Sequence, residues 1–224
     1  MSLFFISTET ETLLKISCLN FGGDNLEVDL TISYPPDLDT LNVVVPWNEK
    51  QFQFTAKHHC LPTTGYVKVG AESFSFHPDT DFAVLDFGRG IWPYASTWNW
   101  GMASGKQGEQ TVGLNLGGQW TDGTPTTENA IIVDGHLTKI SDDLHFHYDV
   151  NNFMKDWHVT CTSHRLELSF TPLFERVATT NVGIIKSEVH QMIGHYNGII
   201  HLNEEETIEI THLLGCIEDH VARW

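Results

Sequence analysis

Hydrophobic and polar residues alternate along most of the chain with a period of two, which is the pattern of half-buried β-strands. Residues 26–34 show it clearly, with Val28, Leu30 and Ile32 on one face and acidic or hydroxyl-bearing residues on the other. No segment keeps a helical period, and residues 172–177 could supply at most a turn or two of helix. We therefore expect an all-β fold, an antiparallel sandwich or barrel with little helix.

The same pattern locates the expected strands and the turns between them. Asp134-Gly135 lies between two apolar runs and is a strong hairpin signal. Residues 61–65 and 102–108 are typical of turns or loops, and the glycine-rich residues 117–125 form the candidate lid or domain junction. The expected strands cover residues 12–19, 26–34, 42–47, 51–57, 66–69, 73–76, 82–87, 110–116, 128–133, 136–140, 144–148, 157–161, 166–170, 182–193, 198–202, 207–215 and 216–223.

The length of 224 residues suits one large all-β domain or two small ones. We expect one contiguous unit over residues 1–224, with two packed barrel halves that meet near residues 117–126 as the alternative. No internal repeat is evident. The abrupt start of the chain suggests the later part of a longer protein.

The chain carries 29 acidic and 12 basic residues, for a formal net charge of −17. A field of this sign repels nucleic acid and anionic lipid, so neither is expected as a partner. A high negative charge also favours solubility, which is the simpler explanation for it. No apolar run approaches the roughly 20 residues that span a bilayer, so no membrane span is expected either.

The four cysteines lie far apart and form no CxxC spacing. They are typical of free core thiols in a reducing compartment, although two disulfides remain an alternative. The first residues are too short and lack the basic segment of a signal peptide. Together these features predict a cytoplasmic protein.

Residues 86–101 hold three of the seven tryptophans and three glycines. In an extended backbone, side chains two apart share a face. One wall of the fold would then be nearly all aromatic, which suits either a barrel core or the lining of an apolar pocket. The side chains on this wall are Trp92, Tyr94, Ser96, Trp98 and Trp100.

Asp86 and Arg89 precede this aromatic wall. A carboxylate and a guanidinium are costly to bury unless they are paired, and together they form a strong bidentate pair. Such a pair would either belong to a site or act as a salt bridge that holds a turn at Gly88 and Gly90. Both interpretations remain open.

Further ionisable residues could join Asp86 and Arg89 if the chain closes into a barrel. A carboxylate beside an imidazole can act as an acid/base couple, and burial in an aromatic pocket raises the pKa of a carboxylic acid. A structural role is the alternative for each of these residues taken alone. We take Asp86, Glu128 and His190 as candidate catalytic residues, and Arg89, Trp92, Tyr94, Trp98, Trp100, Gln191, Glu218 and His220 as candidate ligand-binding residues.

Common catalytic and cofactor motifs are missing. His145 and His147 share a strand face, but no third ligand is suitably spaced, so we expect no metal site. The glycines of residues 117–125 do not form the GxGxxG motif of dinucleotide-binding proteins. No nucleophile motif is present. The sequence therefore predicts no cofactor and no hydrolytic activity.

Several ordered motifs resemble an uncharacterised bacterial family, the domain of unknown function numbered twenty-eight-oh-four. This family lies within the lipocalin-like, or calycin, group, and the resemblance runs from about Leu41 to the last residue. It implies antiparallel lipocalin-like barrels with an interior pocket. The motifs are Asp86-Phe87-Gly88-Arg89-Gly90-Ile91-Trp92-Pro93-Tyr94, Trp98-Asn99-Trp100-Gly101, Gly113-Leu114-Asn115-Leu116-Gly117, Thr127-Glu128-Asn129, His190-Gln191 and Glu218-Asp219-His220-Val221-Ala222-Arg223-Trp224.

These observations support three hypotheses for the function. The first is a lipocalin-like barrel that binds an apolar or amphipathic small molecule against the tryptophans. The second is a cofactor-independent hydratase, isomerase or cyclase that protonates an isoprenoid-like substrate with Asp86 or Glu128, assisted by His190 or His220. This chemistry is an analogy to distant calycin relatives, because fold does not fix function. The third is a structural or partner-binding β module, with the tryptophans in an exposed flat patch.

Overall fold

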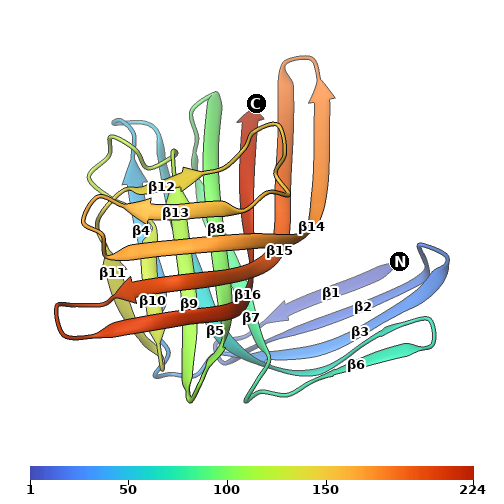
Figure 1. Ribbon diagram of the computed structural model, residues 1–224. Coiled ribbons are helices and arrows are strands. Elements are labelled where there is room, and N and C mark those ends of the chain that lie inside the picture. The colour runs from blue at the N-terminus through green and yellow to red at the C-terminus, as the bar shows by residue number, and fades with distance from the viewer.

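The computed structural model describes residues 1–224 and consists of strands without any helix (Figure 1). All strand pairs are antiparallel and form two sheets, so the predicted all-β antiparallel fold is confirmed. The strands are β1 (Ser2–Ser7), β2 (Glu11–Phe21), β3 (Asp24–Ser33), β4 (Leu41–Pro46), β5 (Phe52–Val69), β6 (Glu72–Phe76), β7 (Phe82–Ile91), β8 (Ala95–Gln107), β9 (Gln110–Gly118), β10 (Asn129–Val133), β11 (His136–Ile140), β12 (Leu144–His147), β13 (Trp157–Cys161), β14 (Leu166–Val182), β15 (Ile185–His201) and β16 (Thr207–Arg223).

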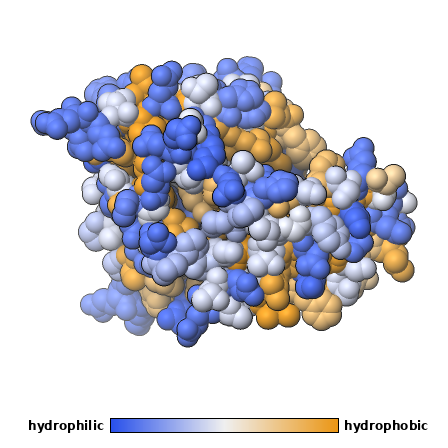
Figure 2. All heavy atoms as spheres, turned by 90° about the horizontal axis from the view of Figure 1, so that it is seen from below, coloured by the Kyte–Doolittle hydropathy of each residue, from blue (hydrophilic) through white to orange (hydrophobic).

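The first sheet is organised around β5, which changes partners along its length. Its first half pairs with β4 and β7, and its second half pairs with β3 and β6. The pairing with β7 shifts between His58 and Leu61, and such a bulge bends a strand. Strands β1, β2, β3 and β6 therefore form an arm that projects from the molecule (Figure 1), and Figure 2 shows hydrophobic residues at the surface on this side.

The second sheet has nine strands in the order β11-β10-β9-β8-β16-β15-β14-β13-β12. Its three longest strands, β14 to β16, run beside β8 at one end and turn sideways at the other (Figure 1). Register shifts at Pro172/Phe174 and Tyr196/Gly198 lie in this bend. Because bulges add local twist and curvature, the sheet curls into a half-barrel.

The concave side of the half-barrel is a packed core. Its 21 buried hydrophobic residues come from every strand between β8 and β16, and the largest are Trp157, Tyr196 and Phe170. A smaller cluster lies between the two sheets. It contains Leu41, Val43, Val45, Trp120 and Ala130, with Trp47, Trp92, Trp98 and Leu137 packed against them.

Three local predictions are wrong. Residues 61–65 are not a turn, because β5 continues through them, and the predicted loop at residues 102–108 is strand β8 as far as Gln107. Residues 172–177 belong to β14. Pro172 is tolerated because it lies at the bulge of β14, where the ladder is already interrupted. Gly105 lies inside β8, where a side chain would press against Leu213. Residues typical of turns thus mark bulges and close packing here.

The chain passes from the first sheet to the second between β7 and β8, at residues 92–94. Residues 119–128 connect β9 with β10, which are neighbours in the same sheet. The division into domains stays a prediction.

All four cysteines are free thiols, so the alternative of two disulfides is wrong. The chain forms no helix of the length and apolar character that a membrane-spanning helix requires.

Candidate functional site

A pocket lies between the two sheets, on the face of β8 and β16 that points away from the packed core. Trp98 and Trp100 of β8 share this face with Glu218 of β16, because directly paired residues project to the same side. Strands β5 and β7 of the first sheet form the opposite wall. The cavity has a volume of about 100 Å³ and is lined by Gln53, Thr55, Lys57, Asp86, Trp92, Trp98, Trp100, Trp120, Glu128 and Glu218.

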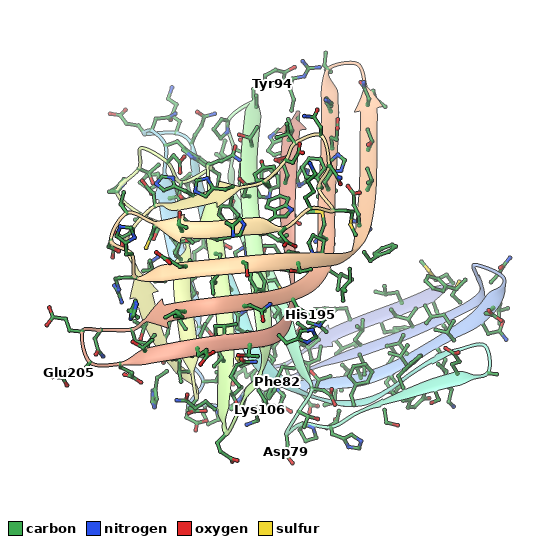
Figure 3. All side chains as sticks on the ribbon, in the orientation of Figure 1. Asp79, Phe82, Tyr94, Lys106, His195 and Glu205 are labelled. Carbon is green, nitrogen blue, oxygen red and sulfur yellow. The ribbon has the colours of Figure 1, made fainter.

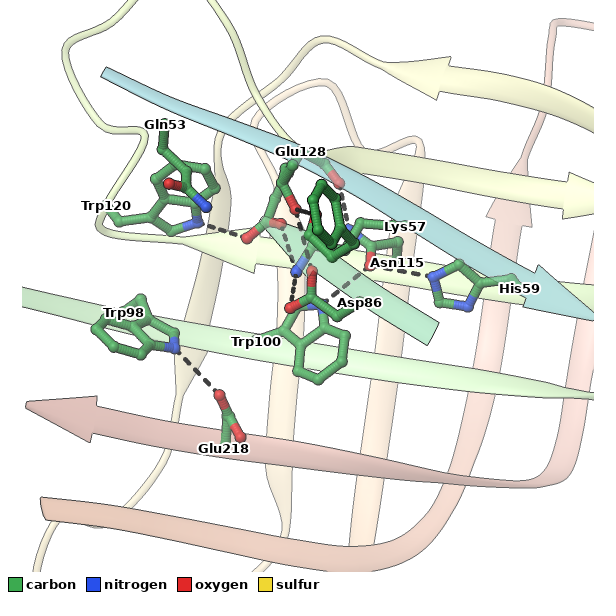
Figure 4. A network of polar contacts seen from close by, with 12 residues as sticks. Gln53, Lys57, His59, Asp86, Trp98, Trp100, Asn115, Trp120, Glu128 and Glu218 are labelled. Atoms are coloured by element: carbon green, nitrogen blue, oxygen red, sulfur yellow. Dashed lines mark hydrogen bonds and ion pairs between the residues drawn. The ribbon is translucent and has the colours of Figure 1, made fainter. Parts of the chain in front are cut away.

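Lys57 is the charged centre of this tryptophan pocket (Figure 4). Its Nζ lies 2.8 Å from Oδ2 of Asp86 and 3.3 Å from Oε2 of Glu128. The side chains of Lys57 and Glu128 are 7% and 2% exposed, whereas that of Asp86 is 42% exposed. Burial alone would lower the pKa of the Lys57 ammonium, but the two carboxylates outweigh it and hold the pKa above its usual value. The pocket therefore contains a stable, shared ion pair.

The four indole N–H groups of the pocket all donate to protein atoms. Trp92 donates to Oε1 of Gln53 at 2.7 Å, and Trp98 donates to Oε1 of Glu218 at 3.1 Å. Trp100 donates to Oδ1 of Asn115 at 2.9 Å, and Trp120 donates to Oε1 of Glu128. The Trp92 ring also stacks on Trp120, with centroids 5.4 Å apart. A ligand would thus meet ring surfaces and no free indole donor.

Glu218 is a buried carboxylate without a cationic partner. Its Oε1 accepts from Trp98, and its Oε2 accepts from Nε2 of Gln191 at 2.9 Å, but it forms no ion pair. Burial raises the pKa of Glu218, and these two hydrogen bonds oppose the shift. A carboxyl group with a raised pKa in a cleft is a functional-site candidate.

A second layer of polar residues fixes the pocket wall. Oδ1 of Asn115 accepts from Trp100 and from Nε2 of His59, and its amide donates to the Glu128 carbonyl. Burial lowers the pKa of His59 to about 4, so its ring is neutral. Gly117 leaves room for the Glu128 carboxylate, which a side chain at that position would hit.

Most of the predicted site residues come together in or beside this pocket. Gln191 joins it by its hydrogen bond to Glu218, and the His220 ring lies 4.0 Å from the Trp98 ring. The residues brought together are Asp86, Glu128, Trp92, Trp98, Trp100, Gln191, Glu218 and His220.

Three predicted residues, His190, Tyr94 and Arg89, lie outside the pocket. His190 is on the opposite face of the sheet from Gln191, where its Nδ1 is 2.6 Å from Glu175 Oε1. Tyr94 lies at the upper end of the molecule (Figure 3), where its hydroxyl donates to the carbonyl of Ile184. The proposed grouping of these two side chains with the site is therefore not supported by their positions.

Arg89 does not pair with Asp86, and the predicted salt bridge between them is wrong. The two residues are three apart on β7 and so project to opposite faces, and the guanidinium lies over the Phe54 ring at 5.9 Å. No turn forms at Gly88 and Gly90 either. Side chains at these positions would collide with Gln53, so the glycines make room for that amide.

Sequence reasoning missed four lining residues. Gln53, Thr55 and Lys57 alternate along β5 like the solvent face of a strand, so the sequence offered no signal that they are buried. Trp120 lies in residues 117–125, the candidate lid or domain junction, and its large apolar side chain was the signal that this segment packs against the protein. It is 8% exposed and packs against Trp47 and Trp92.

No group of three histidine, cysteine, aspartate or glutamate side chains is arranged to hold a metal ion. His145 and His147 lie on the exposed face of β12 with ring centroids 6.4 Å apart. The groups that line the pocket with charge or aromatic surface are three carboxylates, the Lys57 ammonium and four indole rings.

Two solved structures are similar to the chain. A Nitrosomonas europaea protein assigned as AttH shares 13% identity with a TM-score of 0.55, over 98% of this chain and 67% of its own. Kievitone hydratase from Nectria haematococca shares 10% identity with a TM-score of 0.56, over 96% of this chain and 65% of its own. At such identities the likeness shows the fold alone, and it confirms the lipocalin-like fold. The chain spans about two thirds of each protein.

Comparison with curated protein sequences gives no match. A family described as "Domain of unknown function (DUF2804)" matches residues 1–224, which confirms the family resemblance seen in the ordered motifs. The chain belongs to the DUF2804 family.

Proposed function

We propose that the protein binds an amphipathic small molecule in the tryptophan pocket. The observation that carries this proposal is the convergence of four indole rings and four ionisable groups on one cavity between the sheets. Binding sites for small molecules typically combine an aromatic lining with a few placed polar groups. The core of the half-barrel is filled by side chains, so the site proposed is the space between the sheets.

The two parts of the ligand would be recognised by different walls. Its apolar part packs on the surfaces of Trp92 and Trp98, which are partly exposed. A polar group reaches Asp86, whose side chain is 42% exposed and already accepts from Thr55 at 3.1 Å. The cavity of about 100 Å³ takes only part of a larger molecule, and the remainder would extend toward solvent past Asp86.

Titration with two small amphipathic probes, choline and its uncharged carbon isostere neohexanol, tests this proposal. We expect at least one of them to bind, detected by calorimetry, and Trp98→Ala to abolish the binding. Phe74→Ala is the control, because Phe74 is 51% exposed on the arm. Binding of neither probe, or equal loss in both variants, would show that the pocket is not a receptor. Native mass spectrometry of the purified protein would identify a ligand that co-purifies.

Acid catalysis is a second candidate, in the form of a cofactor-independent hydratase, isomerase or cyclase that acts on an isoprenoid-like substrate. Asp86 and Glu128 are less suited to donate the proton, because both form ion pairs with Lys57. Glu218 has no cationic partner and a raised pKa, the property of a proton donor.

Deuterium incorporation from D₂O into geraniol tests the catalytic candidate. Protonation of a carbon by Glu218 would place deuterium on the substrate, and Glu218→Gln would remove the activity. Glu209→Gln, an exposed position on the same strand, should leave it intact. Wild-type protein that incorporates no deuterium, or a Glu218→Gln variant as active as wild type, would exclude this role.

A further inference from the structure

We infer that the ligand of the tryptophan pocket is an organic cation, and that its substituted ammonium group lies against Trp98 and Glu218. This inference rests on the proposed binding function and adds the chemical class of the ligand. It follows from the charges in the pocket, from the way the indoles are held, and from a comparison of the two ends of the cavity.

The charges that line the pocket are unbalanced. Three carboxylates, those of Asp86, Glu128 and Glu218, face a single ammonium, that of Lys57. Lys57 forms ion pairs with the first two only, so Glu218 keeps neutral hydrogen-bond donors and no counterion. A buried carboxylate without a counterion is unfavourable, and a cationic ligand would remove that cost. An anionic ligand would increase it.

The aromatic wall suits the same kind of ligand. Every indole N–H of the pocket is already donated to a protein acceptor, so the rings offer a ligand their faces. The face of an indole carries negative electrostatic potential and attracts ammonium groups, most strongly those that are methylated and weakly hydrated. Trp98 combines such a face with a hydrogen bond that fixes its edge on Glu218.

The Lys57 end of the pocket shows this recognition with the protein's own cation. There the ammonium is held by two carboxylates and lies 4.3 Å from the centroid of the Trp100 ring. The Glu218 end repeats the arrangement of carboxylate and indole through Trp98, but no lysine or arginine reaches it. A ligand ammonium at this end would complete a second copy of the same interaction.

Lys57 is the one positive charge in the cavity, and although its charge also lowers the pKa of Glu218, it forms its ion pairs with Asp86 and Glu128. His220 covers one side of Trp98, and burial lowers the pKa of this histidine, so its ring is neutral at neutral pH. The Lys139 ammonium is held by the carbonyls of Thr127 and Asn129 and does not line the cavity. The formal net charge of −17 also raises the local concentration of cations.

Three probes of similar size and shape test the sign of the ligand's charge. They are cationic choline, uncharged neohexanol and the anion of tert-butylacetic acid (tert-butylacetate). We expect wild-type protein to bind choline at least about tenfold more tightly than neohexanol, and tert-butylacetate most weakly. Equal binding of choline and neohexanol would overturn the inference while the proposed binding function stands. Binding of none of the three would overturn both.

Glu218→Gln locates the source of the preference. The substitution should reduce choline affinity about tenfold and leave neohexanol affinity nearly unchanged, because it removes a charge and keeps the side-chain shape. Glu209→Gln is the matched control, an exposed glutamate on the same strand. Equal losses of choline affinity in the two variants would show that the preference for a cation comes from the overall charge of the protein. This result would overturn the placement of the ammonium at Glu218. Circular dichroism of each variant checks that it is folded.

Discussion

The two faces of β8 and β16 show how one sheet serves two purposes. The face toward the half-barrel carries residues such as Ala103 and Ile217, both almost fully buried in a core of 21 hydrophobic residues. The opposite face carries Trp98, Trp100 and Glu218, which meet the first sheet across a cavity. One face is held by packing and the other by a polar network. Substitutions on the two faces should therefore differ in cost and in pH dependence.

Removal of the shared ammonium should have the largest effect on the pocket face. We expect Lys57→Met to lower the free energy of unfolding by about 3–5 kcal/mol, because it leaves the buried Glu128 carboxylate without its partner. Urea unfolding at neutral pH measures this. Lys15→Met, which breaks an ion pair with side chains 50% and 41% exposed, is the control and should cost at most about 1 kcal/mol.

The pH dependence gives a second readout for Lys57. Because its folded-state pKa lies above the usual 10.5, its contribution to stability is fully present below that pH. The contribution is lost as the pH rises through the folded-state pKa. Wild type should therefore lose stability relative to Lys57→Met in this alkaline range. A Lys57→Met variant within about 1 kcal/mol of wild type at neutral pH would contradict the importance of the network.

The core face should respond to volume and not to charge. Leu114→Ala should cost about 2–5 kcal/mol, since this fully buried side chain would leave a cavity in the core. The loss should be the same across the pH range, in contrast to the pocket variants. Leu214→Ala, at a position 56% exposed on β16, is the matched control. Thermal and urea unfolding at several pH values would show whether the two faces really differ.

The core face could be predicted from the sequence, because alternation reports burial directly when one face is apolar. Val112, Leu114 and Leu116 were placed together on one face of a strand, and all three are fully buried. The hairpin at Asp134-Gly135 also forms as predicted. Strands were broken off wrongly at Pro172 and near Gly105, because a bulge or close packing gives the same local signal as a loop.

The pocket face was predictable only in part. The alternation brought Trp98 and Trp100 to one wall, and the structure places both in the pocket. Lys57 was missed because a polar residue on an alternating strand normally faces solvent, and only the packing of a distant sheet buries it. The partner of Asp86 was misassigned to Arg89 for the same reason. Contacts between sheets are not encoded in the local pattern.

Glu218 offers a smaller effect with a distinct pH signature. Its folded-state pKa lies above the usual 4.5, so the folded chain binds the proton more tightly than the unfolded chain. Stability therefore falls as the pH rises between these two values, and the cost is complete above the folded-state pKa. Glu218→Gln removes this cost, and we expect it to be more stable than wild type at about pH 8, by less than the losses expected for Lys57→Met and Leu114→Ala.

The free energy of unfolding of wild type and of Glu218→Gln, followed between about pH 4 and pH 8, measures this effect. The difference should shrink toward the acidic end, as the wild-type carboxyl becomes protonated in both states. Glu209→Gln, on the exposed face of the same strand, should show no such trend. A Glu218→Gln variant that loses stability as the pH rises would mean that the ionised carboxylate stabilises the fold.

The smallest effect should come from Asp86, the other carboxylate on Lys57. Its side chain is 42% exposed, and Lys57 keeps Glu128 as a partner when Asp86 is replaced. We expect Asp86→Asn to cost less than about 1 kcal/mol, as for exposed ion pairs. Glu128→Gln, at a side chain 2% exposed, should cost more in the same urea experiment. If the two substitutions cost the same, burial would not decide the strength of these ion pairs, and the pocket face would behave like ordinary surface.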